Sequence, residues 1–109
     1  MSKQQTDVPY GTLDLLILRT LADEKLHGWA ISKRIRETSR GTLEVHQGSL
    51  YPALYRLRDR GLIEGEWGIS PEGRRARFYR LTDDGRKALS EQSRAWADFT
   101  AAVNWVLAT

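Results

Sequence analysis

The sequence predicts a mainly α (α+β) fold in which three short helices precede a two-stranded hairpin and one long C-terminal helix. Three segments before residue 62 carry apolar residues at the three- and four-residue spacing of a helix face. Between residues 62 and 81 the apolar period falls to two, which is typical of a half-buried strand. From residue 82 onward the helical spacing returns.

The first helix is expected in residues 12–22, TLDLLILRTLA, which open with a natural N-cap residue, Thr12. One helical face carries Leu13, Leu16, Ile17, Thr20 and Leu21. Leu15 and Leu18 extend the apolar surface beyond that face, so we expect this helix to be covered from two sides.

The second helix is expected in residues 29–41, WAISKRIRETSRG, with Ile31 and Ile35 on its inward edge. Gly41 is expected at its C-terminal cap or just after it. The remaining faces are rich in Lys and Arg, which gives this helix a basic outer surface.

The third helix is expected within the stretch GSLYPALYRLRDRGLI, residues 48–63, whose last two residues already belong to the next element. Gly48 or Ser49 is the expected N-cap, which would place Pro52 in the first turn, where a missing N–H removes no intrahelical bond. Gly61 is expected to end the helix. The inward face carries Leu50, Leu54 and Leu57. The neighbouring outward stripe carries Tyr51, Tyr55 and Arg58.

The segment after the third helix is expected to form a hairpin, with strands in residues 62–68 and 76–81 joined by the Pro- and Gly-containing loop 69–75. Residues 82–108 then form a long helix with Thr82 as its N-cap. Together these elements make a winged helix-turn-helix with a two-stranded β-wing and a long C-terminal dimerisation helix.

Three regions follow from this order. We expect a flexible N-terminal segment in residues 1–9, a winged-helix DNA-binding domain in residues 10–81 and a C-terminal dimerisation helix in residues 82–109. In the helix-turn-helix docking mode, the second helix of the pair enters the major groove of DNA with its N-terminal residues toward the base edges.

Composition restricts the cellular setting and the partner. The chain has 109 residues, a formal net charge of +3 and no cysteine, which excludes disulfides and favours a reducing compartment. It contains neither the apolar core of a signal peptide nor an apolar run of roughly 18 residues, so we expect a soluble, cytoplasmic protein without a membrane partner. Eleven Lys and Arg against six Asp and Glu between residues 33 and 80 give the middle of the chain a net charge of +5.

Motifs of catalysis are absent from the sequence. His27 and His46 lack the spacing of a metal site, and the adjacent Asp83 and Asp84 would point about 100° apart on a helix, a poor geometry for a catalytic pair. There is no glycine-rich phosphate loop and no nucleophile elbow. We therefore expect no enzymatic activity, no metal and no cofactor.

Three motifs resemble, in order, the PadR family of bacterial transcriptional regulators: HGWAISKRI, GSLYPALYRLRDRGLI and GRRARFYRLTDDGRKAL. The family pattern is G-x-LY-x-x-L-x-x-L-x-x-x-GL-I, followed by an arginine-rich wing that ends in Y-x-LT-x-x-G. The resemblance covers roughly residues 10–90, and the single C-terminal helix resembles the short members of the family. Trp29 departs from the HGY form that is common there. The resemblance implies a homodimeric repressor that binds an inverted repeat of double-stranded DNA.

Nine side chains on the second helix, the third helix and the wing are the candidate DNA contacts. They are Lys33, Arg36, Gln47, Ser49, Tyr51, Tyr55, Arg74, Arg75 and Arg77. The start of the third helix offers hydroxyls, an amide and unpaired N–H groups to bases and phosphates. The wing guanidinium groups suit phosphate or a narrow minor groove.

Several of these residues have structural alternatives. Lys33 and Arg36 can form a solvated face, and Tyr55 can rest against the core with its hydroxyl outward. Arg77 or Arg80 can instead pair across the hairpin with one of the two glutamates of the first strand, Glu64 and Glu66.

The last helix carries an apolar stripe with the heptad spacing of 3, 4, 3, 4 and 3 residues. Its members are Leu89, Gln92, Trp96, Phe99, Val103 and Val106. We expect a two-fold homodimer in which this stripe meets the same helix of a second chain, together with Leu13 and Ile17 of that chain's first helix. The alternative is that the stripe folds back on its own domain.

Two functional questions stay open at this level. Trp96 and Phe99 are candidates for binding a planar aromatic effector between the two subunits, as some short PadR-like regulators do; the alternative is that they only pack in the interface. For the whole chain, the alternative to a DNA regulator is a winged helix used for protein or RNA contacts, because a fold alone does not fix function.

Overall fold

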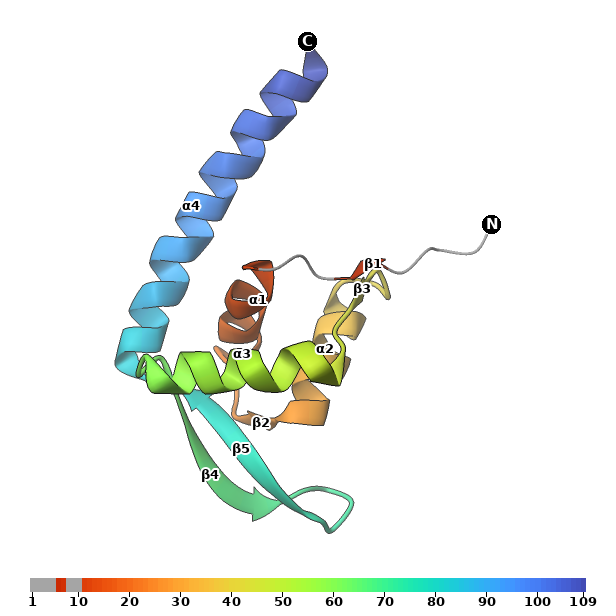
Figure 1. Ribbon diagram of the computed structural model, residues 1–109, viewed down its shortest axis with the longest axis vertical. Helices are drawn as coiled ribbons and strands as arrows, with labels where there is room; N and C mark the ends of the chain where they lie inside the picture. The colour runs from red at the N-terminus through yellow and green to blue at the C-terminus, as the bar shows by residue number, and fades with distance from the viewer. Residues whose placement is uncertain (1–5, 8–10) are drawn as a thin grey trace.

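The computed structural model describes residues 6–7 and 11–109, which form helices and strands in the predicted winged-helix order (Figure 1). The helices are α1 (Thr12–Thr20), α2 (Gly28–Thr38), α3 (Gln47–Asp59) and α4 (Asp83–Ala108). The strands are β1 (Thr6–Asp7), β2 (Leu26–His27), β3 (Leu43–Glu44), β4 (Ile63–Ile69) and β5 (Arg75–Leu81). Apart from β1, the expected flexible segment 1–9 lies outside the described residues.

The predicted hairpin is confirmed as the antiparallel pair β4–β5, which forms the wing. Its turn is closed by the Ser70 N–H, which donates to the Arg74 carbonyl at 2.7 Å, and Gly73 adopts the left-handed conformation there with φ of 81°. β2 pairs with β5, so the sheet has three strands in the order β2-β5-β4. Neither β2 nor the parallel pair β1–β3 was predicted, because strands of two residues carry no periodic signal.

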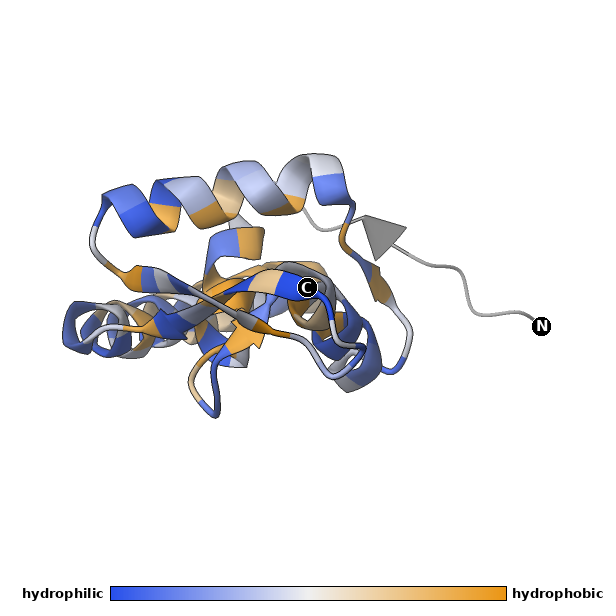
Figure 2. Cartoon of the chain, turned by 90° about the horizontal axis from the view of Figure 1, so that it is seen from below, coloured by the Kyte–Doolittle hydropathy of each residue, from blue (hydrophilic) through white to orange (hydrophobic). Residues whose placement is uncertain are grey.

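The hydrophobic core lies where α1, α2 and α3 meet the base of the wing. Its largest fully buried side chains are Ile17, Leu18, Leu21, Ile31, Leu50, Leu54, Leu57 and Ile63. Figure 2 shows hydrophobic residues concentrated between the helices and the sheet. The inward faces predicted for the three helices are therefore confirmed, and each buried Leu or Ile contributes roughly 1.5–3 kcal/mol.

Two helix ends are those that the sequence predicts. Gly61 follows α3 in the left-handed conformation, and the Leu62 N–H donates to the Leu57 carbonyl at 3.0 Å, the bond of a Schellman motif. Thr82 caps α4, because its Oγ1 accepts from the Gly85 N–H at 3.0 Å. These two ends place the hairpin between α3 and α4.

The predicted start of α1 is wrong by one residue. Thr12 is the first helical residue, and Gly11, with φ of 91°, occupies the N-cap position without a side-chain bond. At the end of α2, the capping residue is Ser39, and Gly41 lies two residues beyond it. Of the two expected positions for Gly41, at the cap or after it, the second is correct.

The predicted start of α3 is also wrong. The helix begins at Gln47 with His46 as its N-cap, and the Ser49 N–H already donates to the His46 carbonyl at 3.0 Å. Gly48 and Ser49 are therefore helical rather than capping residues. Pro52 consequently lies in the second turn, where its missing N–H does remove the bond that the Gly48 carbonyl would accept.

α1 is covered on two sides, as predicted, but by elements of its own chain. It contacts α2, α3 and α4, and Asp14 accepts from the Arg56 guanidinium of α3 at 2.9 Å. Leu13 is 6 % exposed and Ile17 is not exposed at all. Ile17 therefore has no surface to offer a second chain, so its predicted contact is wrong, whereas Leu13 keeps a small exposed surface.

α4 leaves the domain after its first turns and extends away from it (Figure 1). Leu89 still packs against the core, whereas Trp96 is 44 % and Phe99 is 60 % exposed. Leu89 and Gln92 are therefore the partly buried members of the stripe, and the members from Trp96 onward are exposed. Neither α4 nor any other helix in the described part of the chain is long and apolar enough to cross a membrane.

Candidate nucleic-acid interface

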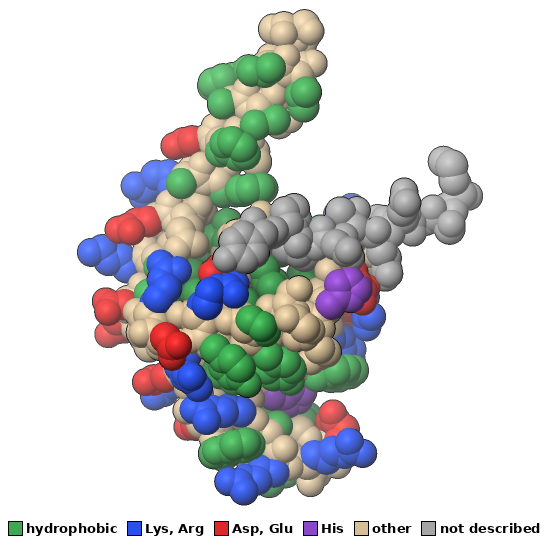
Figure 3. Space-filling model, in the orientation of Figure 1, with side chains coloured by type: hydrophobic (Ala, Val, Ile, Leu, Met, Phe, Trp, Pro, Cys, Tyr) green, Lys and Arg blue, Asp and Glu red, His purple; other side chains and the backbone are tan. Residues whose placement is uncertain are grey.

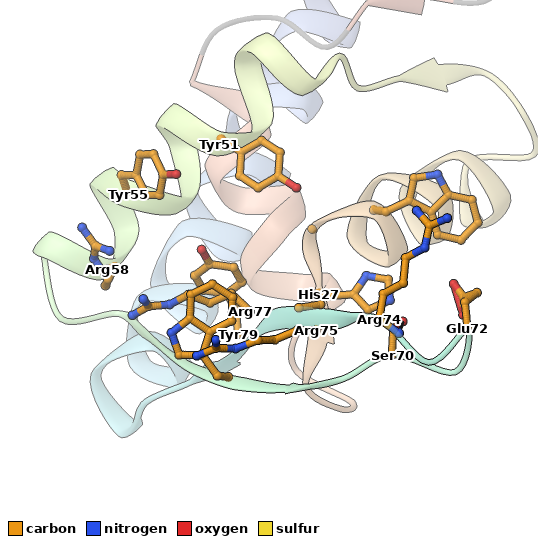
Figure 4. A pocket seen from close by; sticks show the side chains of 14 residues that line it. His27, Tyr51, Tyr55, Arg58, Ser70, Glu72, Arg74, Arg75, Arg77 and Tyr79 are labelled. Atoms are coloured by element: carbon orange, nitrogen blue, oxygen red, sulfur yellow. Dashed lines mark hydrogen bonds between the residues drawn. The ribbon is translucent and has the colours of Figure 1, made fainter.

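A cleft of about 1100 Å³ lies between α3, the wing and the start of α2 (Figure 4). Aromatic and cationic side chains dominate its lining. The lining residues are His27, Gly28, Trp29, Tyr51, Tyr55, Arg58, Trp67, Ser70, Glu72, Arg74, Arg75, Ala76, Arg77 and Tyr79. Five of the nine predicted DNA contacts, two on α3 and three on the wing, therefore meet in one site.

The α3 wall of the cleft presents two tyrosines, one helical turn apart. The Tyr51 and Tyr55 ring centroids are 6.5 Å apart, and the Arg58 guanidinium carbon lies 5.2 Å from the centroid of the Tyr55 ring. Tyr51 packs so closely over Gly28 that a Cβ atom at that position would lie 2.8 Å from the tyrosine Oη. Tyr55 is half exposed in the cleft, so its ring is open to a ligand there while part of it packs against the protein.

The alternation of side chains along β5 sorts the wing arginines into two groups. Arg75 and Arg77 lie on the face toward α3, where the guanidinium carbons are 4.5 Å and 5.8 Å from the centroid of the Trp67 ring. Arg80 lies on the opposite face and forms an ion pair with Glu64 at 2.6 Å.

The other glutamate of strand β4, Glu66, pairs with a lysine outside the wing. Glu66 accepts from the Lys25 ammonium at 2.8 Å, which lowers the pKa of its carboxyl group. The cross-strand alternative is thus correct for Arg80, and Arg77 remains in the cleft.

Tyr79 forms the floor of the cleft beside Arg77. It is 2 % exposed, and burial raises the pKa of its phenol. The Tyr79 hydroxyl is therefore protonated at neutral pH. The Arg77 Nε is buried and has no hydrogen-bond partner among the described residues.

His27 joins the wing to the start of α2. Its Nδ1 accepts from the Ala30 N–H at 3.2 Å and so caps α2. The imidazole also packs edge-on against Phe78 of β5, with ring centroids 5.3 Å apart. The N-terminus of α2 is therefore tied to the wing strand.

A second, smaller pocket of about 230 Å³ adjoins the cleft at Trp29, which lines both. It brings together three more predicted contacts, Lys33, Arg36 and Gln47. The Lys33 ammonium lies 5.2 Å from the centroid of the Trp29 ring. Ser49, the remaining predicted contact, is exposed on α3 but lines neither pocket.

The other lining residues of the cleft were not assigned to the site from the sequence, among them Trp29, Arg58, Trp67 and Tyr79. Arg58 had a signal, because it belongs to the outward stripe with the two tyrosines. Tyr79 also had a signal, because it lies two residues after Arg77 on the same predicted strand and so shares its face. Trp67 looked like an ordinary strand residue, since only the pairing register shows that it lies opposite Arg77.

The cleft combines positive charge, hydroxyl groups and exposed aromatic faces. Figure 3 shows Lys and Arg side chains around hydrophobic ones on the face formed by α3 and the wing. Within the described ranges, no group of His, Asp or Glu is placed to hold a metal ion. Cations and tyrosine hydroxyls on a helix start and a wing suit a nucleic-acid backbone, and together with the fold they define a DNA-binding protein of the winged helix-turn-helix class.

Comparison with known proteins identifies the family. Residues 17–91 match the Transcriptional regulator PadR-like family, and the chain belongs to this family. It is 39 % identical over 89 residues to Transcriptional regulator Rv3488 of Mycobacterium tuberculosis, which covers 82 % of this chain and 79 % of that protein.

Two solved structures have the same fold. A PadR family transcription regulator from hypervirulent Clostridium difficile has a TM-score of 0.77 and 28 % identity, over 89 % of this chain and 99 % of that one. A transcriptional regulator from Clostridium thermocellum has a TM-score of 0.78 and 29 % identity, over 86 % and 91 % of the two chains. PadR-like proteins are transcriptional regulators rather than enzymes, bind DNA and generally form dimers.

Proposed function

We propose that the chain is a dimeric, sequence-specific repressor that binds an inverted-repeat operator in double-stranded DNA. The observation that carries this proposal is the convergence of Tyr51 and Tyr55 from α3 with Arg74, Arg75 and Arg77 from the wing on one cleft. In this arrangement α3 enters a major groove and the wing follows the adjacent backbone and minor groove. The half-sites of the operator lie about one helical turn apart.

The first test is binding to DNA from upstream of the chain's own gene, measured by fluorescence anisotropy against a scrambled duplex at two salt concentrations. We expect specific binding that weakens steeply as salt rises, because neutralising phosphates releases counterions. In an Arg74→Ala/Arg75→Ala variant, the log–log salt dependence should be shallower by about 4, roughly one unit for each of the phosphates that the two subunits together no longer neutralise.

The matched control for this variant is Arg80→Ala, which removes a cation from the opposite face of the same strand, where it pairs with Glu64. Its salt dependence should stay close to that of the wild type. If the upstream duplex and a genomic DNA pool both fail to bind specifically, the proposed function fails and the alternative of a winged helix that makes protein contacts is favoured.

The proposed dimer uses α4. Beyond the first turns of this helix, four members of the heptad stripe are exposed in the protomer: Trp96, Phe99, Val103 and Val106. Monomeric proteins rarely expose a contiguous apolar surface of this kind. The same helix of a second chain, lying across a two-fold axis, would cover it.

The proposed function also includes an effector, a planar aromatic molecule held between the two copies of Trp96. The Trp96 and Phe99 rings are 6.0 Å apart with an interplanar angle of 42°, so each subunit offers an aromatic face beside the seam. Titration with planar cationic dyes should quench tryptophan fluorescence with saturation.

Three other tryptophans contribute to that signal, so the dye experiment needs two variants. Trp96→Ala should abolish the saturable part of the quenching. Trp105→Ala, which removes an exposed tryptophan on the opposite side of α4, should leave it in place. Saturable quenching that persists in the Trp96→Ala variant would rule out this effector site.

A further inference from the structure

Arg77 occupies a slot that other wing residues form around it. A Cβ atom at Gly65, on the neighbouring strand, would lie 2.7 Å from the Arg77 Nε and 3.2 Å from a ring carbon of Tyr79. The guanidinium carbon is 5.8 Å from the centroid of the Trp67 ring. The Arg77 side chain therefore lies across the bare backbone at Gly65, next to Trp67 and Tyr79.

Packing rather than hydrogen bonding holds this pose. The Arg77 Nε is buried without a partner among the described residues, and both glutamates of β4 are engaged elsewhere, Glu64 with Arg80 and Glu66 with Lys25. A buried donor without a partner is unusual in a folded protein and points to a binding role for the group that carries it. A guanidinium group fixed by packing also loses less rotamer entropy when it binds an anion.

A second cation shares the same indole. The Arg75 guanidinium carbon lies 4.5 Å from the centroid of the Trp67 ring, so the guanidinium groups of both Arg75 and Arg77 contact the indole of this exposed tryptophan. Two like charges gathered on one ring repel each other, and an anion bound beside them relieves that repulsion. The facing wall of the cleft supplies the Tyr51 and Tyr55 side chains of α3.

We infer that the cleft seats one phosphodiester of the DNA strand that runs between α3 and the wing, with Arg77 as its anchor. Trp67 and Gly65 are positioning residues: Trp67 orders Arg77 and Arg75, and Gly65 leaves the space in which Arg77 lies. This inference rests on the proposed function, because α3 in the major groove and the wing on the next groove leave the sugar–phosphate backbone between them. The guanidinium fork matches the two non-bridging phosphate oxygens.

The test is a mutant cycle on operator affinity, measured with the full chain and the duplex that the wild type binds. Trp67→Ala should weaken binding by about threefold to thirtyfold, the range of a cation–π contact, although it removes no charge. The same substitution should have little further effect in an Arg75→Ala/Arg77→Ala background. Trp67→Phe, which keeps an aromatic face, should restore most of the affinity.

Gly65→Ala gives an independent test, since it preserves every charge and the indole. The added methyl group displaces the Arg77 side chain, so affinity and salt dependence should both fall toward those of Arg77→Ala. Ile69→Ala is the matched control: it truncates an exposed apolar residue on the same strand that does not line the cleft, and it should bind as the wild type does. Circular dichroism of all variants checks that the wing stays folded.

The outcomes separate the inference from the proposed function. If the wild type binds operator and Trp67→Ala binds equally well, the positioning role is wrong while the regulator stands. If Trp67→Ala weakens binding as much in the Arg75→Ala/Arg77→Ala background as in the wild type, Trp67 contacts DNA directly and the inference is overturned. If the wild type binds no duplex specifically, the proposed function fails first.

Discussion

Gly85→Ala is expected to lower the free energy of unfolding by about 3 kcal/mol, although alanine favours a helix by up to about 1 kcal/mol over glycine. Gly85 is buried in the first turn of α4. A Cβ atom there would overlap the Leu62 carbonyl oxygen and lie 3.2 Å from the Leu81 Cδ2. The overlap is with backbone, which cannot rotate away, so the clash outweighs the gain in helix propensity.

The affected contact holds the wing and α4 together. The same Leu62 carbonyl accepts from the Thr82 N–H at 3.1 Å, and the Thr82 hydroxyl donates to the Gly61 carbonyl at 2.6 Å. Moving α4 to admit a methyl group would break this junction between the end of α3, the wing and the N-cap of α4. Steric crowding against the Leu62 carbonyl therefore explains why the L-T-x-x-G motif has glycine at its last position, Gly85.

Thermal unfolding followed by circular dichroism, at one protein concentration, measures this effect. We expect the melting temperature of Gly85→Ala to fall by about 10 °C or more. Gly48→Ala is the matched control, because a Cβ atom at this helical glycine meets nothing within 4 Å. That variant should melt at or slightly above the wild-type temperature, and equal melting of both variants would contradict the steric argument.

The sequence predicted the parts of the fold that depend on a periodic residue pattern or on a local helix-end signal. Three leucines at helical spacing fixed the buried face of α3, and Gly61 and Thr82 marked helix ends through chemistry that is local to each residue. The start of α3 was missed because the helix begins at Gln47, ahead of the residues with good capping side chains, and is capped by His46 without a side-chain bond. Capping preference is worth too little to decide a boundary that tertiary packing sets.

The candidate site was predictable as a set of residue types rather than as a geometry. Arg74, Arg75 and Arg77 stood out as a run of cations, but nothing local to them showed that Arg80 has a glutamate opposite and Arg77 does not. That distinction depends on the register of β4 and β5 and on Lys25, a distant residue that engages Glu66. The error at Ile17 had a similar cause, because an apolar surplus on a helix does not tell whether its own chain or a second one covers it.

Val103→Glu is expected to convert a dimer into a monomer and to weaken binding to an inverted repeat by about 10²- to 10⁴-fold. Val103 lies in the centre of the exposed part of the heptad stripe on α4. In the proposed dimer its two copies come close to the two-fold axis, so the substitution would bring two carboxylates together in a desolvated seam. Like charges in such an interface cost several kcal/mol.

Asn104→Glu provides the control for this variant, since it adds the same charge one residue further along, about 100° away from the seam. Sedimentation velocity should show a monomer for Val103→Glu and a dimer for Asn104→Glu and the wild type. Affinity for a single half-site should be equal in all three proteins. The Val103→Glu variant loses affinity only for the inverted repeat, because its second subunit is no longer linked to the first and must bind the second half-site from solution. A dimeric Val103→Glu variant would show that the stripe on α4 is not the interface, and the apolar residues from Trp96 onward would then need another partner.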